Sequence, residues 1–110
     1  MPQLSQSALN TLLVELRQGL EGLYGETLSG VYLFGSYARH EADDESDVDL
    51  LIVLKSLRSY SSEVAAAGEL LARLSLERGV VITPVFASET DWVDGRKFFL
   101  SMIRDEAIAA

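Results

Sequence analysis

Leucines recur at spacings of three and four residues near the start of the chain, as expected for one face of an α-helix. The pattern predicts an amphipathic helix over residues 7–23, capped at its start by Ser5 or Ser7 and ended near Gly25. We expect this helix to pack its leucine stripe against a sheet. The stripe consists of Leu9, Leu12, Leu13, Leu16, Leu20 and Leu23.

Two further helices are predicted from the same kind of spacing in the second half of the chain. Apolar positions predict a helix over residues 64–78, which Gly79 closes. The polar, serine-rich residues 55–62 before it predict a loop, and residues 88–92 predict a turn. The C-terminal helix is expected to present an apolar face made of Phe98, Phe99, Met102 and Ile103.

Three apolar runs between these helices are typical of β-strands and cover residues 28–34, 47–54 and 80–86. The last run is dense in β-branched residues, and Pro84 within it indicates an edge strand or a local break. The elements together predict one domain of the α/β class over residues 1–110. We expect a small mixed sheet of three or four strands with its helices mainly on one face.

The strand over residues 47–54 opens with two aspartates that share one face of the sheet. Alternate residues of a strand point the same way, so the Cβ atoms of Asp47 and Asp49 lie roughly 6.5 Å apart. Two carboxylates so close on a half-buried strand repel each other unless a cation compensates them. Such oxygen ligands suit Mg²⁺, which commonly binds one or two carboxylates together with substrate phosphates. Gly35 and Ser36, just past the preceding strand, add flexible backbone, N–H donors and a hydroxyl for phosphates.

A longer motif contains these residues: Gly35-Ser36, ten further residues, then Asp47-x-Asp49. It resembles the signature of the nucleotidyltransferase superfamily related to polymerase beta. The flanking segments FGSYAR and SDVDL resemble its minimal nucleotidyltransferase (MNT) branch, small proteins often paired with a HEPN-domain partner. The resemblance implies the polymerase beta-like fold, with ATP as substrate and Mg²⁺ as cofactor. It implies catalytic and metal-binding roles for Asp47 and Asp49, and nucleotide binding by Gly35, Ser36 and Arg39.

The segment after Ser36 is expected to form a short helix over residues 37–41, with Ser36 as its cap. Such a helix start would favour a phosphate near Ser36. Arg39 on this segment is placed to bind the same anion as a bidentate donor. The alternative for Arg39 is a surface ion pair with Glu41 or Asp43, which contributes little to stability.

Two other residues of this segment are expected to have structural roles. Tyr37 occupies a position where the family is permissive, and we expect it to pack near the mouth of the site. His40 stands where the family commonly has glycine, and we expect a solvated surface side chain. If the turn requires a positive φ there, histidine tolerates it less well than glycine.

The resemblance also implies a third carboxylate on the strand next to the two aspartates, where it helps hold metals and acts as a base. The predicted strand over residues 80–86 contains no acidic residue, and Thr83 stands at the corresponding position. Glu89 and Asp91 follow this strand and are weaker candidates for metal ligands. The missing carboxylate is the main argument against catalysis.

Composition limits the partners of the chain. Its 110 residues carry 9 Lys plus Arg against 17 Asp plus Glu, a net charge of −8, which argues against a long nucleic acid. The lack of cysteine excludes disulfides and thiolate metal sites. No signal-peptide pattern and no apolar run near the roughly 20 residues of a membrane helix are present, so we expect a soluble, cytoplasmic protein. The acidic residues 41–49 predict a solvated loop that also suits a basic partner protein.

Two hypotheses follow for the function. The first is an enzyme that transfers AMP from ATP to a hydroxyl of a partner protein, the antitoxin of a HEPN/MNT toxin–antitoxin pair. The second is a catalytically weak or inactive module of the same fold that neutralises its partner by contact alone. The motif favours the first and the neutral Thr83 favours the second. An oligomer is compatible with the sequence, which leaves the base preference and the acceptor residue open.

Overall fold

The computed structural model describes residues 3–95 and 97–110, which form four strands, four α-helices and a short 3₁₀-helix. The strands agree closely with the apolar runs in the sequence, although the third begins and ends two residues later than predicted. The elements in chain order are α1 (Gln6–Tyr24), η1 (Gly25–Thr27), β1 (Leu28–Phe34), β2 (Val48–Leu54), α2 (Tyr60–Arg78), β3 (Ile82–Ser88), α3 (Glu89–Asp94), α4 (Phe98–Glu106) and β4 (Ile108–Ala109).

The four strands form one mixed sheet in the order β3-β2-β1-β4. β1 is antiparallel to both β2 and β4, whereas β3 is parallel to β2. β3 is therefore an edge strand, as Pro84 indicated, and the missing N–H of this proline is tolerated there. The mixed four-stranded sheet confirms the predicted fold class.

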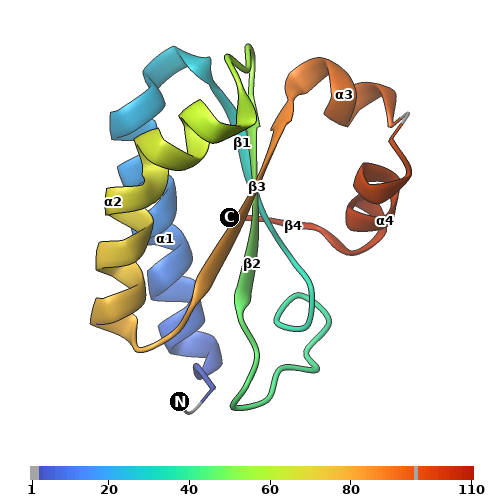
Figure 1. Ribbon diagram of the computed structural model, residues 1–110. Coiled ribbons are helices and arrows are strands. Elements are labelled where there is room, and N and C mark those ends of the chain that lie inside the picture. The colour runs from blue at the N-terminus through green and yellow to red at the C-terminus, as the bar shows by residue number, and fades with distance from the viewer. Residues whose placement is uncertain (1–2, 96) are drawn as a thin grey trace.

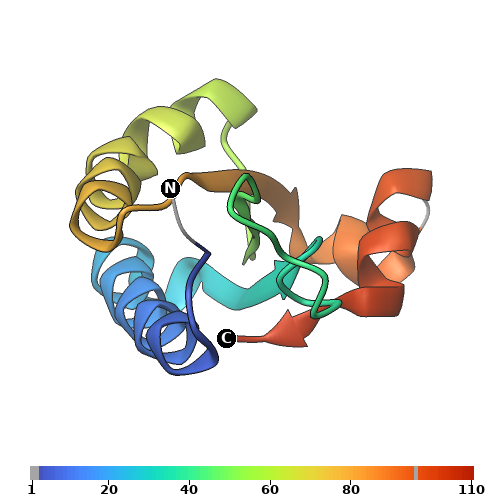
Figure 2. The same ribbon diagram turned by 90° about the horizontal axis from the view of Figure 1, so that it is seen from below.

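Helices lie on both faces of the sheet, with the two long helices α1 and α2 together on one face and the short helices α3 and α4 on the other (Figure 1, Figure 2). The main core fills the space under α1 and α2, where side chains such as Leu12, Leu16 and Ile52 are fully buried. Burial of each such side chain contributes about 1.5–3 kcal/mol to folding. A smaller core under α3 and α4 consists of Leu51, Val53, Ala87, Leu100 and Ile103.

The two long helices end where the sequence indicated. Ser5 caps α1, its hydroxyl accepting a hydrogen bond from the Ala8 N–H at 3.1 Å. Gly79 ends α2 in the left-handed conformation that glycine adopts at least cost. The start of α2 differs from the prediction, because Ser59 caps a helix that already begins at Tyr60, within the serine-rich segment predicted as a loop.

Three local predictions were wrong. Residues 89–94 form the helix α3 rather than a turn, because the Ser88 hydroxyl accepts a hydrogen bond from the Asp91 N–H and caps it. The short helix predicted over residues 37–41 is absent, and residues 36–40 form hydrogen-bonded turns instead. In α4 the predicted apolar face is largely exposed, and Leu100 and Ile103 make the core contacts. The apolar residues 98–100, 102 and 103 cover a broad sector of this helix, so their spacing alone did not show which part of it packs on the sheet.

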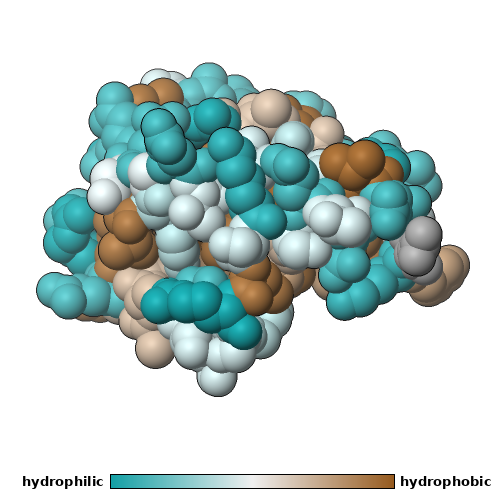
Figure 3. All heavy atoms as spheres, turned by 90° about the horizontal axis from the view of Figure 1, so that it is seen from above, coloured by the Kyte–Doolittle hydropathy of each residue, from teal (hydrophilic) through white to brown (hydrophobic). Residues whose placement is uncertain are grey.

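Seen from above, the end of the molecule that carries the start of α2 is covered mainly by hydrophilic residues, with separate hydrophobic patches between them (Figure 3). Within residues 3–95 and 97–110, no helix combines the length and the apolar character needed to cross a membrane.

Candidate active site

β2 places Asp49 on the face of the sheet that α3 and α4 cover, and Asp47 comes directly before the first residue of this strand. Leu50 and Ile52 point into the main core under α1 and α2, whereas Leu51 points into the smaller core on the other face. Asp49 shares the face of Leu51 by the alternation of the strand. Asp47 contacts Thr83, the residue of β3 that pairs with Asp49. The side chain of Asp47 is exposed and that of Asp49 is partly buried.

Gly35 follows directly after β1 and lies against the carboxylate of Asp49. The antiparallel pairing aligns Phe34, the last residue of β1, with Asp49. Gly35 has φ = 78°, and a Cβ atom built there would overlap Oδ2 of Asp49. Only glycine therefore permits this arrangement, which brings the two halves of the sequence motif into contact.

The electrostatics of the pair agree with the repulsion expected from the sequence. Partial burial raises the pKa of Asp49, and the charges of Asp47 and Glu106 raise it further, while Arg39 acts in the opposite direction. The positive charge of Arg39 thus offsets only part of the effects that raise the pKa of Asp49. A divalent cation would supply the missing charge.

Thr83 occupies the position where the family resemblance implies a third carboxylate. The parallel pairing of β2 and β3 aligns it with Asp49, and its hydroxyl donates a hydrogen bond of 3.3 Å to Oδ2 of Asp47. The two other candidates lie elsewhere. Glu89 accepts a hydrogen bond from the Ser29 hydroxyl, and Asp91 pairs with Lys97 at 2.9 Å.

The turn after Gly35 brings Arg39 back toward the start of the motif. The Arg39 N–H donates to the Gly35 carbonyl at 3.1 Å, and the Glu41 N–H donates to the Ser36 carbonyl at 2.9 Å. The guanidinium of Arg39 pairs with Glu41, the alternative that the sequence had left open, at 3.3 Å. It also pairs with Glu106 at 2.9 Å. The hydrogen bond that Arg39 donates to Glu41 and the charge of Glu106 raise the pKa of Arg39, which stays cationic.

Tyr37 and His40 have the structural roles expected for them, with one correction. Tyr37 is buried in the main core, where its hydroxyl accepts a hydrogen bond from the Leu4 N–H, and it does not line the mouth of the site. His40 is exposed and has φ = 59°, a conformation that glycine adopts more easily than histidine.

Glu106, at the end of α4, is the one carboxylate near the site that the sequence did not indicate. Its Oε2 accepts hydrogen bonds from the Gly35 N–H at 2.6 Å and from Nη1 of Arg39 at 2.9 Å. The contacts span 71 and 67 residues of sequence, so local patterns carried no sign of them. They depend on the short strand β4, which joins α4 to the sheet beside β1.

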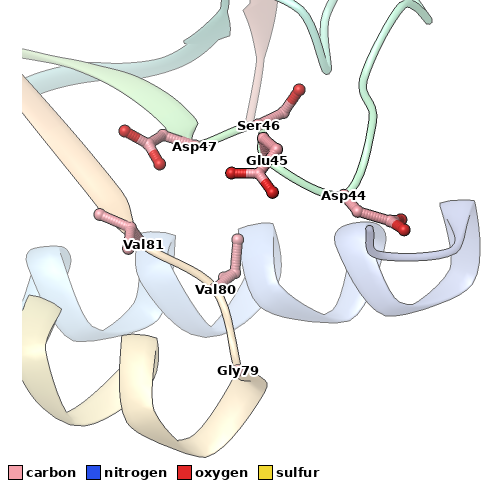
Figure 4. A pocket seen from close by; sticks show the side chains of 7 residues that line it. All are labelled: Asp44, Glu45, Ser46, Asp47, Gly79, Val80 and Val81. Carbon is pink, nitrogen blue, oxygen red and sulfur yellow. The ribbon is translucent and has the colours of Figure 1, made fainter. Parts of the chain in front are cut away.

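A cavity of about 210 Å³ opens on the other side of Asp47, between the acidic segment 44–47 and residues 79–81 (Figure 4). Gly35, Ser36 and Asp49 do not line it. It shares Asp47 with the motif but does not extend to the Gly-Ser bend.

The chemistry of the donors at the motif fits a magnesium ion bound together with phosphates. Asp47 and Asp49 offer hard oxygen ligands at the start of β2, and Gly35 leaves room beside Asp49. In the part of the chain that the structure describes, no group of three or more His, Cys, Asp or Glu side chains is arranged to hold a metal. Asp47 and Asp49 would be the protein ligands of such an ion, with the substrate completing its coordination.

Comparisons with known proteins agree with this geometry. The family described as "Polymerase beta, Nucleotidyltransferase" matches residues 24–89, a segment that contains all of the motif. The chain is 32% identical over 79 residues to "Putative protein adenylyltransferase MJ0141" of Methanocaldococcus jannaschii. That match covers 72% of this chain and 79% of the relative.

Solved structures show the same fold. One described as "Structure of putative minimal nucleotidyltransferase" matches with a TM-score of 0.67 and 24% identity, over 96% of both chains. A chain from tri-AMPylated Shewanella oneidensis HEPN toxin in complex with MNT antitoxin matches with a TM-score of 0.51 and 16% identity. This second match covers 89% of this chain and 70% of that one. The arrangement of sheet and helices is thus that of nucleotidyltransferases, as predicted.

Proposed function

We propose, because this chain belongs to the polymerase beta-like nucleotidyltransferase family, that it transfers AMP from ATP to a hydroxyl group of a partner protein. The observation that carries the proposal is the contact of Asp49 with Gly35, which joins a pair of carboxylates to a Gly-Ser bend. In this proposal the partner is a HEPN-like toxin, and the modification silences it. The relative named as a protein adenylyltransferase and the structure of an AMPylated toxin with its antitoxin support this choice of substrate and partner.

Each residue of the motif has a distinct task in this proposal. Asp47 and Asp49 hold Mg²⁺, which when bound neutralises charge on the phosphates of ATP. Ser36 offers its hydroxyl and backbone N–H to the triphosphate, and Arg39 offsets the negative charge that develops on it during transfer. The glycine at position 35 keeps the bend close to Asp49.

The reaction exchanges one bond to phosphorus for another. The hydroxyl oxygen of the acceptor bonds to the α-phosphorus of ATP, and the bond from that phosphorus to the bridging oxygen of the β-phosphate breaks. Pyrophosphate leaves, and the hydroxyl proton passes to solvent, because Thr83 provides no carboxylate to accept it. We expect a slower reaction than in relatives that have an acidic residue at this position.

The second candidate function is inhibition of the partner by contact alone. The neutral Thr83 beside Asp47 is the specific observation in its favour, because two-metal chemistry usually needs a further anionic ligand. In that case the aspartates bind a cation without supporting transfer.

One experiment separates the two functions. The chain is purified with the protein encoded by its neighbouring gene, incubated with ATP and Mg²⁺, and the neighbour is weighed by mass spectrometry. A gain of one or more AMP groups that is lost in Asp47→Asn/Asp49→Asn supports transfer. A neighbour that is inhibited but unmodified supports contact alone and contradicts the proposed activity.

A further inference from the structure

We propose that Glu106 is a positioning residue that holds the Gly35–Arg39 turn in the conformation that binds the triphosphate. The inference rests on the proposed function, since it concerns how that site is held rather than what it does. It makes the C-terminal helix part of the nucleotide site, although no part of the sequence motif lies there.

The geometry shows one oxygen atom connecting the two ends of the turn. Oε2 of Glu106 accepts from the backbone N–H of Gly35 at 2.6 Å and from Nη1 of Arg39 at 2.9 Å. The first contact anchors the turn where it leaves β1, and the second fixes a long side chain that is otherwise exposed. The side chain of Glu106 is 27% exposed and that of Arg39 is 45% exposed, so the contact between them is partly shielded from water.

Two features of the fold place Glu106 beside this turn. The Ala107 N–H bonds to the Ile103 carbonyl at 2.9 Å and closes the last turn of α4 directly after Glu106. β4 then pairs with β1, with Ile108 opposite Leu33. Continuing this antiparallel register by two residues in each direction brings residue 106 opposite residue 35. The side chain of Glu106 thus accepts a backbone hydrogen bond where the β1–β4 ladder has ended.

This contact leaves the phosphate-binding donors available. A guanidinium carries five N–H groups, and Arg39 uses one at Nε for Glu41 and one at Nη1 for Glu106. Within the described parts of the chain, neither the hydroxyl nor the N–H of Ser36 donates a hydrogen bond. Both donors are therefore available to a phosphate. The N–H of Gly35 is occupied by Glu106. The contribution of Gly35 to the site is therefore its missing side chain rather than its amide.

The contact with Glu106 orders groups that the substrate would otherwise have to order on binding. An exposed arginine loses rotamer freedom when it binds a phosphate, and a glycine-containing turn loses backbone freedom. With Glu106 in place, both are restricted before ATP arrives. A carboxylate this close also adds negative charge beside Asp49, which strengthens the need for a cation at the two aspartates.

The test compares Glu106→Ala and Glu106→Gln in the full chain, with Asp105→Asn as a matched control on the adjacent, exposed residue of α4. Two quantities are measured: the hydrogen-exchange rate of the Gly35 amide by NMR without nucleotide, and the Kd for Mg²⁺·ATP by calorimetry. In Glu106→Ala we expect Gly35 exchange to become at least about tenfold faster and Kd to rise about tenfold. Glu106→Gln keeps an acceptor for the Gly35 N–H but loses the charge facing Arg39, and we expect intermediate values.

The remaining outcomes separate this inference from the proposed function. A Gly35 amide that stays protected in Glu106→Ala overturns the inference, whatever the nucleotide does. An unchanged Kd, or tighter binding because Glu106 had competed with ATP, also overturns it. If the wild-type chain binds no Mg²⁺·ATP, the proposed function itself fails, and the nucleotide role of Glu106 fails with it.

Discussion

Glu63 and Asp49 are two partly or fully buried carboxylates near opposite ends of β2, and their surroundings differ sharply. Glu63 is 2% exposed, and three donors surround it: the guanidinium of Arg58 at 3.0 Å, the Arg58 N–H at 3.3 Å and the Tyr24 hydroxyl at 3.4 Å. The hydrogen bond from Arg58 is the main reason that the pKa of Glu63 is lowered. At Asp49 burial and a neighbouring carboxylate raise the pKa instead.

The difference separates a carboxylate whose charge the protein balances from one whose charge it balances only in part. Glu63 has its counter-charge within the protein, so its ionised form is stable without any other molecule. Asp49 is held beside Asp47 with only part of its charge balanced by Arg39. We expect this arrangement to lower the stability of the folded chain.

The largest effect expected from this comparison is on activity. Asp49→Asn keeps the size of the side chain but removes a metal ligand, and we expect AMP transfer to fall by about a thousandfold or more. Glu63→Gln, at the other end of β2, is expected to change the transfer rate less than about twofold at a temperature where it is folded. Rates are measured with the modified partner by mass spectrometry. Equal losses in the two variants would contradict the distinction.

The next largest effect is on the stability of the fold. Here we expect the change at Glu63 to have the larger effect. Glu63→Ala removes the acceptor of three hydrogen bonds, and we expect the free energy of unfolding to fall by about 2 kcal/mol in urea titrations. Glu69→Ala, an exposed glutamate on the same helix, is the control and should change it by less than about 0.5 kcal/mol. A small loss at position 63 would show that its partners contribute little.

The dependence of stability on pH distinguishes the two carboxylates by sign. The pKa of Glu63 is lowered by folding, so its contribution is present above the unfolded-state pKa and is lost as pH falls through the folded value. The pKa of Asp49 is raised, so stability is lost as pH rises through its folded value. Without Mg²⁺ at pH 7 we therefore expect Asp49→Asn to be more stable than the wild type, by up to about 1 kcal/mol.

Urea titrations from pH 3 to pH 8 measure both differences. The advantage of Asp49→Asn should disappear in acid, where the wild-type carboxyl is protonated in both states. The deficit of Glu63→Gln should also shrink in acid, because Glu63 then loses its charge. A stability advantage of the wild type over Asp49→Asn at neutral pH would mean that Asp49 is balanced by the protein after all.

The smallest effect concerns the hydroxyl of Tyr24. Burial is the main cause, and the charge of Glu63 the next, of a pKa of Tyr24 that is raised to about 12. Tyr24→Phe removes its long hydrogen bond of 3.4 Å to Glu63, and we expect a loss of only about 0.5 kcal/mol. In an alkaline absorbance titration the variant should lack a tyrosine transition near pH 12. If the variant instead lacks a tyrosine transition near the ordinary pKa of about 10, Tyr24 is not shielded from water.

The sequence was sufficient where the physical cause is local. The apolar pattern placed Asp47 and Asp49 at the start of a strand, and the spacing to Gly35 and Ser36 identified the bend that meets them. Pro84 indicated the edge strand, and the order of residues alone showed that Thr83 stands where an acidic residue is expected. Each of these features depends on residues within one strand or one motif.

The features that sequence reasoning missed depend on packing between distant segments. Glu106 reaches Gly35 only because a two-residue strand, too short to produce a hydrophobic pattern, pairs with β1. The buried face of α4 is set by the contacts of Leu100 and Ile103 with the sheet, and the exposed Phe98 is just as hydrophobic. Arg58 and Glu63 are only five residues apart, but they pair because α2 begins between them, at a position that the sequence did not predict.

The most direct test of the central claim is calorimetric titration of the chain with Mg²⁺·ATP, comparing two double variants that each remove two negative charges. Asp47→Asn/Asp49→Asn changes the aspartates beside the Gly-Ser bend, whereas Asp44→Asn/Glu45→Gln changes exposed residues of the neighbouring acidic loop. We predict that the wild type and the loop variant bind with similar affinity and that binding to the aspartate variant is at least about a hundredfold weaker. Equal binding by all three proteins would contradict the claim that Asp47 and Asp49 hold the metal–nucleotide complex.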